Sequence, residues 1–283
     1  MKKYKFEDYL IMGGILNPTK ENIDLRKLQI NQGLKIHTCN DYENSIETIH
    51  RASKGQENLL RLITKVYYKY PNLKHRRFRP IYNQINEQVS RLGFLPSEYQ
   101  LQICCYCSYR ELTSLYAEEF FMKIKNNFGI SKIFLETYPI YKYNYKEIAL
   151  LNKRYKGIMS FGICGYQNLH NRVFSTKKLK ELSDYSLDTC FIGILGKGVQ
   201  NKIFTDSSKS ENNLNEIDKN LLYFLLNVKK NKNIFGITNV SNLNQYKDLK
   251  SRFNLISKRI DDFDATKVID NISTQKIYLY KNY

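Results

Sequence analysis

Tyr42 and Lys65 are the side chains of this sequence whose types and positions best fit proton-transfer chemistry, because both fall at the ends of predicted strands. A tyrosine hydroxyl ordinarily ionises near a pKa of about 10. A nearby ammonium stabilises the phenolate and lowers that pKa, which makes the tyrosine usable as a general acid. In the competing interpretation, Lys65 extends to solvent and Tyr42 packs in a loop. The chain contains 23 tyrosines, so Tyr42 by itself does not decide between the two.

Histidine and cysteine side chains form a second candidate group at the same strand ends. His37 lies near the end of one predicted strand, Cys105 and Cys107 share a face of another, and Cys164 ends a third. Neutral imidazole and thiolates are good zinc ligands, which permits a metal-site hypothesis. Against it, buried cysteines behave as small hydrophobes, and no C-x2-C spacing joins two separate pairs. We therefore expect reduced thiols and no metal.

Short β-rich runs that alternate with longer amphipathic runs must position these side chains. The sequence predicts strands over residues 9–15, 34–39, 59–66, 101–107, 130–136, 158–164, 188–195 and 233–238. It predicts helices over residues 19–33, 44–55, 80–93, 114–129, 145–157, 175–186, 214–231 and 242–253. Strands that each precede a helix indicate parallel βα units.

Eight such units in about 250 residues fit an α/β fold of the closed (β/α)8 kind, the TIM barrel. An open doubly wound sheet is the main alternative, but the glycines after the first strand, in MGGILN (12–17), lack the G-x-G-x-x-G spacing. In a (β/α)8 barrel the chemistry gathers at the carboxyl ends of the strands, which is where the candidate side chains fall.

The length fits a single large α/β domain or two modest ones, and the eight βα units favour one domain over residues 1–283. Hydrophobic residues make up 42% of the chain, and no apolar run is long enough to span a membrane. The amino-terminal residues lack the pattern of a secretory signal, so we expect a cytoplasmic protein. The formal net charge is +18, but the lysines are scattered among abundant Asn, Ile and Tyr, as A/T-rich codons would give. We therefore expect no nucleic-acid partner, and the oligomeric state is open.

The order of several motifs resembles the aldo-keto reductases, which are (β/α)8 barrels that reduce carbonyls with NADPH. The resemblance covers roughly residues 9–255. Its motifs are HTCNDYENSIE (37–47), ITKV (63–66), EQVSRLG (87–93), YQNLHNR (166–172), ILGKG (194–198) and IFGITNVSNLNQ (234–245). Each is a partial match, and their common order carries the resemblance.

The resemblance implies a role for each candidate catalytic residue. Tyr42 falls on the family's catalytic tyrosine, the proton donor, and Lys65 on the lysine that assists it. His37 stands where the family has an aspartate, and Cys105 where it has a histidine. A histidine supplies no fixed negative charge, and a thiol is a weaker donor than an imidazole. Cys164 replaces the glutamine that lies near the nicotinamide amide.

The same resemblance implies NADP as cofactor. Its phosphate and adenine end would be lined by Gly196, Gly198, Thr238, Asn239 and Asn242, with Lys247 and Lys250 near the 2′-phosphate.

The missing aspartate leaves two hypotheses open. Removing the partner of a buried charge typically costs a few kcal/mol, so Lys65 should lose part of its charged population unless Asp41 or Glu136 reaches it. The first hypothesis is an NADP(H)-dependent reductase of a small carbonyl or sugar-like substrate, with weak or altered turnover. The second is a non-catalytic binding or regulatory protein on the same scaffold, because fold does not determine function.

Overall fold

The computed structural model describes residues 4–14, 16–42, 44–67, 78–104, 108–136, 145–166, 183–195 and 216–261. Four of the candidate site residues, Cys105, Cys107, Gly196 and Gly198, lie outside these ranges, as does most of the helix predicted over 175–186. None of the helices in the described ranges is long and apolar enough to cross a membrane.

Eight parallel strands close into a barrel in the order of the sequence, which confirms the predicted (β/α)8 fold. The strands are β1 (Leu10–Gly13), β2 (Lys35–Cys39), β3 (Arg61–Tyr67), β4 (Glu98–Cys104), β5 (Lys132–Glu136), β6 (Ser160–Tyr166), β7 (Thr189–Ile192) and β8 (Ile234–Asn239). The barrel closes between β1 and β8, whose register runs from Leu10 opposite Gly236 to Gly13 opposite Asn239.

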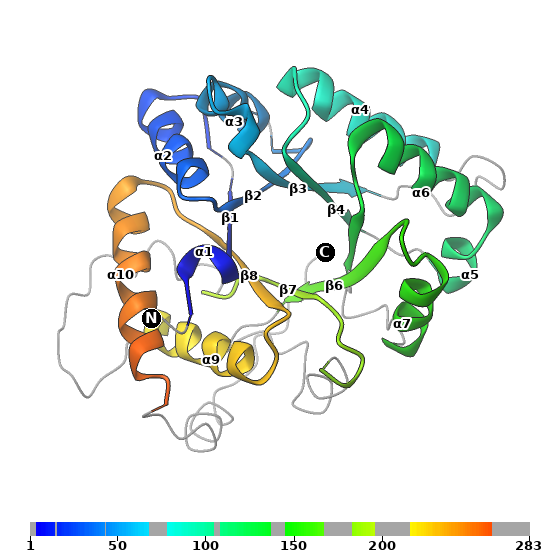
Figure 1. The fold of residues 1–283 in the computed structure, drawn as a ribbon. Helices are drawn as coiled ribbons and strands as arrows, with labels where there is room; N and C mark the ends of the chain where they lie inside the picture. Colours follow the sequence, from blue (N-terminus) through cyan, green and yellow to red (C-terminus); the bar gives the residue numbers. More distant parts are fainter. Residues whose placement is uncertain are drawn as a thin grey trace, which may run out of the picture.

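Helices surround the strands, as Figure 1 shows. They are α1 (Phe6–Tyr9), α2 (Lys20–Asn31), α3 (Ser45–Ser53), α4 (Arg79–Leu92), α5 (Tyr109–Leu112), α6 (Leu115–Phe128), α7 (Tyr145–Arg154), α9 (Glu216–Lys230) and α10 (Leu243–Arg259), with a 3₁₀ turn, η1, at Glu57–Leu59. The sequence does not predict α1, α5 and η1, because elements this short show no helical periodicity.

Local signals explain where the longer helices begin and end. Thr19 caps α2 by accepting a hydrogen bond from the backbone N–H of Asn22, and Pro80 stands in the first turn of α4. Gly93 and Gly129 end α4 and α6 in the left-handed conformation that glycine adopts at no steric cost. No such stop follows Phe253, so α10 continues past its predicted end to Arg259.

The apolar core has two parts. The larger part lies between the strands and the helices. The smaller part fills the barrel interior and consists of Ile11, Ile63, Phe134, Cys164, Cys190 and Ile237. Gly162 leaves room for this filling, because a Cβ built on it would lie 2.6 Å from the carbonyl oxygen of Asp188 and 2.9 Å from the ring of Phe134.

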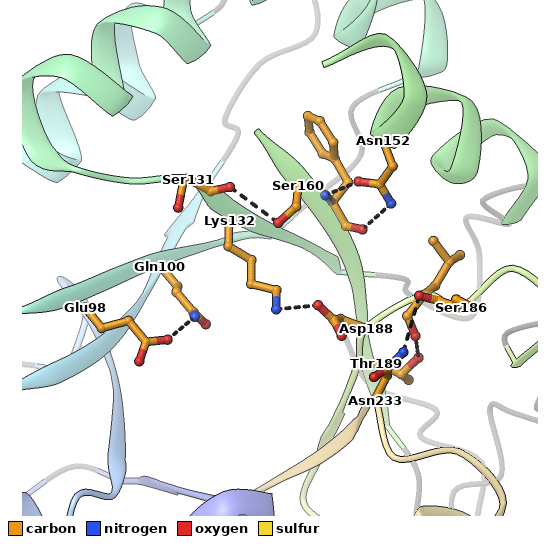
Figure 2. A network of polar contacts seen from close by, with 12 residues as sticks. Glu98, Gln100, Ser131, Lys132, Asn152, Ser160, Ser186, Asp188, Thr189 and Asn233 are labelled. Carbon is orange, nitrogen blue, oxygen red and sulfur yellow. Dashed lines mark hydrogen bonds and ion pairs between the residues drawn. The ribbon is translucent and has the colours of Figure 1, made fainter. Parts of the chain in front are cut away.

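Charged side chains line the amino-terminal end of the barrel. Lys35 and Arg61 pair with Glu98 at 2.8 Å and 2.6 Å. Lys132 reaches across to Asp188, which precedes β7, as Figure 2 shows. β4 begins at Glu98, three residues before its predicted start at residue 101. The prediction placed the start too late because an inward-facing glutamate interrupts the apolar pattern from which strands are predicted.

Candidate active site

Lys65 lies inside the barrel near the carboxyl end of β3. Side chains alternate along a strand, so Lys65 shares the inward face with Ile63 of the interior core. The register places Lys65 beside Cys39 of β2 and beside Gln102 of β4. The end of β3 is held by Gln84 of α4, which exchanges two hydrogen bonds of 2.9 Å with the backbone of Tyr67.

Glu136 of β5 supplies the carboxylate partner of Lys65. Its Oε2 lies 3.4 Å from Lys65 Nζ, and the side chains of Lys65 and Glu136 are only 11% and 1% exposed. Burial alone lowers the pKa of Lys65, but Glu136, with smaller contributions from Cys104, Tyr67 and Tyr42, brings the pKa above its ordinary value. Lys65 therefore stays charged, and Asp41, the other candidate partner, is exposed.

Gln102 links the Lys65–Glu136 pair to His37. The Gln102 amide nitrogen donates to Glu136 Oε2 at 2.8 Å, and Gln102 Oε1 lies 2.8 Å from His37 Nε2. A carboxylate only accepts hydrogen bonds, so the amide must turn its nitrogen towards Glu136 and its oxygen towards His37. His37 therefore carries its proton on Nε2, and Nδ1 is left as an acceptor.

His37 is neutral at this position. Burial lowers its pKa to about 4, the charges of Lys65 and Arg26 act in the same direction, and the hydrogen bond to Gln102 opposes them. A neutral imidazole agrees with the expectation that His37 cannot replace a fixed negative charge. The charge that the resemblance places on strand two is carried here by Glu136 on β5.

Tyr42 lies in the turn between β2 and α3. Its backbone N–H donates to the carbonyl of Cys39 at 3.1 Å, and its carbonyl accepts from the N–H of Ser45 at 2.7 Å. Its ring stands edge-on to the ring of His37, with centroids 6.3 Å apart. Within the described ranges no hydrogen bond joins its hydroxyl to Lys65.

The expected lowering of the Tyr42 pKa is wrong in its net direction. Burial raises the pKa of the phenol above its ordinary value and outweighs the charge of Lys65, which lowers it. Lys65 thus acts on Tyr42 in the predicted sense, but the half-buried setting of the ring has the larger effect. The phenol is protonated at neutral pH and is a weak acid.

Tyr67 is a second phenol beside Lys65 and was not among the residues predicted from the sequence. Lys65 Nζ lies 5.2 Å from the centroid of its ring, and burial raises the pKa of its hydroxyl. Tyr67 and Gln102 could have been found by extending the inward face of β3 and β4 in steps of two residues.

Arg26 stabilises the backbone at the carboxyl end of β1. This fully buried side chain of α2 donates to the carbonyls of Gly13 and Gly14 at 2.9 Å and 3.2 Å, and to Gln29 Oε1 at 2.8 Å. Its burial lowers the pKa of the guanidinium to about 10. The end of β1 is therefore held by a cation bonded to backbone oxygens.

The buried thiol of Cys164 is protonated. Cys164 pairs in register with Cys190 on β7, and both are buried. Burial raises the pKa of the Cys164 thiol, and the neighbouring Cys190 acts in the same direction. No group of three potential metal ligands occurs within the described ranges.

The residues expected at the phosphate and adenine end are spread over β8 and α10. Thr238 is buried and alternates with the inward-facing Ile237, so it faces the helices. Asn239 lies against Gly13, on which a Cβ would meet its Oδ1 at 2.5 Å. Asn242 caps α10 by accepting from the N–H of Gln245 at 2.9 Å.

The two lysines of α10 differ in their surroundings. Lys247 is exposed. Lys250 donates to Glu7 at 2.6 Å and to Gln32 at 2.7 Å, so its ammonium is engaged within the protein.

Solved structures match this barrel over nearly its whole length, although no family model and no curated protein matches the sequence. An aldo-keto reductase from Klebsiella pneumoniae in complex with NADPH gives a TM-score of 0.60 at 12% identity, over 94% of this chain and 89% of that one. An aldo/keto reductase from Brucella melitensis gives 0.57 at 15% identity, over 93% and 92%. The chain has the fold of the aldo-keto reductases.

A further match is an aldo-keto reductase enzyme from a Medee basin deep-sea metagenome library, with a TM-score of 0.58 at 14% identity over 99% of this chain and 97% of that one. The coverage agrees with the sequence resemblance, which spans most of the aldo-keto reductase barrel. The low identity agrees with the departures at His37 and Cys105 from the motifs of the resemblance.

Proposed function

We propose that this chain is an NADPH-dependent reductase of a small carbonyl or sugar-like compound. The observation that carries the proposal is the buried Lys65–Glu136 pair, which keeps an ammonium charged at the carboxyl end of an aldo-keto reductase barrel. That ammonium acts electrostatically on Tyr42. Such an arrangement suits proton donation to an oxygen that becomes negative during reduction.

In this mechanism Tyr42 donates its proton to the carbonyl oxygen, and Lys65 stabilises the phenolate that remains. When bound, the cofactor supplies the hydride that adds to the carbonyl carbon. His37, held neutral with its Nδ1 as an acceptor, can orient a hydroxyl group of the substrate. Because the pKa of Tyr42 is raised, its phenol is a weaker acid, and we expect slow turnover.

One buried oxygen atom that lacks a hydrogen-bond partner in the described ranges could accept a hydrogen bond from the nicotinamide of NADPH. Glu136 Oε1 is buried and has no hydrogen-bond partner among the described residues. The carboxamide of nicotinamide carries N–H donors, and an unsatisfied buried acceptor is stabilised by such a donor. Glu136 would thus hold the amide, and the exposed Lys247 would lie towards the 2′-phosphate.

A non-catalytic binding protein is the second candidate. It is favoured by the raised pKa of Tyr42 and by the missing hydrogen bond between its hydroxyl and Lys65 in the described ranges. The two candidates make different predictions for cofactor binding and for turnover.

The test measures NADPH binding by fluorescence and NADPH oxidation at 340 nm with a panel of small aldehydes and aldoses. For the reductase, Lys65→Met and Tyr42→Phe should keep micromolar binding and lose about 10²–10⁴-fold in turnover. Tyr116→Phe, at an exposed position on α6, is the matched control and should behave as the unmodified protein. Binding only at millimolar NADPH, with no turnover, would favour the non-catalytic protein.

A further inference from the structure

Lys65 and Gln102 both direct hydrogen-bond donors at one oxygen of Glu136. Lys65 Nζ lies 3.4 Å and Gln102 Nε2 lies 2.8 Å from Oε2. The three residues stand on consecutive strands, β3, β4 and β5, which are hydrogen-bonded neighbours. Adjacent strands are about 4.8 Å apart, so the long lysine side chain can span β4, and Gln102 fills the space between.

We infer that Glu136 is the positioning residue that holds the Lys65 ammonium in place and, through Gln102, sets the proton of His37 on Nε2. The catalytic meaning of this inference rests on the proposed function, because Lys65 is there the partner of the proton donor. The positioning itself is a property of the folded protein, with or without turnover.

Three features of the site support Glu136 in this role. Among the described acidic residues, Glu136 is the one that pairs with Lys65. Burial of Lys65 opposes its charged form, and Glu136 makes the largest contribution in the other direction. His37, at the position where the resemblance expects the carboxylate, is neutral and bonded to Gln102.

The test reads the state of Lys65 directly, by competitive labelling with acetic anhydride between pH 7 and 11 and mass spectrometry of the Lys65 peptide. Only the neutral amine reacts. In the unmodified protein we expect Lys65 to resist labelling up to pH 11. Glu136→Gln removes the largest contribution that opposes burial. We expect the pKa of Lys65 to fall by one unit or more, which gives about tenfold or greater labelling at pH 9.

Two further variants make the readout specific. Glu98→Gln removes a carboxylate that pairs with Lys35 at the opposite end of the barrel, so it should leave the labelling of Lys65 unchanged. His37→Asp combined with Glu136→Gln moves the carboxylate to strand two, and it should restore the resistance of Lys65. If Glu136→Gln does not fold, the unmodified protein still tests the inference by ¹⁵N NMR of its histidines, in which His37 should carry its proton on Nε2.

Equal labelling of Lys65 in Glu136→Gln and in the unmodified protein would overturn the inference, as would a His37 proton on Nδ1. A protein that passes both tests but oxidises no NADPH would refute the proposed function and leave the positioning role of Glu136 intact. Conversely, if the unmodified protein turns over NADPH but Lys65 is labelled equally in Glu136→Gln, the reductase function is supported and the positioning role of Glu136 is refuted.

Discussion

Replacing His37 with glutamine should make the protein less sensitive to acid. His37 is buried, and its pKa in the folded state is lowered to about 4, against an ordinary value of 6.5. At a pH between these two pKa values, His37 is protonated in the unfolded chain and neutral in the folded protein. The contribution of His37 to stability is therefore complete above a pH of about 6.5 and is lost as the pH falls towards about 4.

The size of the effect follows from the two pKa values. A difference of about 2.5 pKa units corresponds to about 3 kcal/mol over the full range. Between pH 7 and pH 5 the same linkage gives a loss of about 2 kcal/mol in the free energy of unfolding. Glutamine reaches about as far as the imidazole Nε2, so His37→Gln keeps a donor for Gln102 and removes only the titration.

Urea unfolding of the two proteins at pH 7 and pH 5 measures this loss. The unmodified protein should lose about 2 kcal/mol more than His37→Gln over this interval. His50→Asn is the control, because it removes a histidine from α3 whose Nδ1 bonds to the carbonyl of Leu92, away from the site. Equal pH dependence in His37→Gln and in the unmodified protein would show that His37 is charged or solvated in the folded state and would refute its neutral, buried state.

Two predictions concern the scaffold. Gly162→Ala places a Cβ 2.6 Å from the backbone oxygen of Asp188, which cannot move aside cheaply, and should lower the free energy of unfolding by about 1–3 kcal/mol in a urea titration. Tyr155→Phe removes a buried hydroxyl that donates to the carbonyl of Leu112 at 2.7 Å, and should cost about 1–2 kcal/mol in the same measurement. A cost near zero for Tyr155→Phe would mean that water replaces the lost donor.

The barrel could be predicted from the sequence because its elements follow simple periodicities. Strands such as β3 are largely apolar, and helices such as α4 have a proline in the first turn and a glycine directly after their last residue. The start of β4 was misplaced because Glu98 and Gln100 face inwards, where strand prediction expects apolar residues. Such inward polar residues are visible only when their partners on other strands are known.

The site could be predicted in part. The position of Lys65 and its need for a carboxylate follow from the sequence, but the choice of Glu136 depends on side-chain reach across β4. The net direction of the Tyr42 pKa depends on how deeply the ring is buried, which no local pattern indicates. Tyr67 lies two residues after Lys65 on the inward face of β3, but the strand was predicted to end at residue 66, one residue before it.

Closure of the barrel between β1 and β8 also constrains how the chain is made. Residues 10–13 pair with residues 236–239, so one edge of β1 stays unpaired until residues 236–239 have left the ribosome. At roughly 5–20 residues per second, that interval is on the order of 10–45 seconds. An unpaired strand edge invites pairing with other chains. We therefore expect substitutions in β8 to lower the yield of native protein during synthesis more than they affect barrels that have already closed.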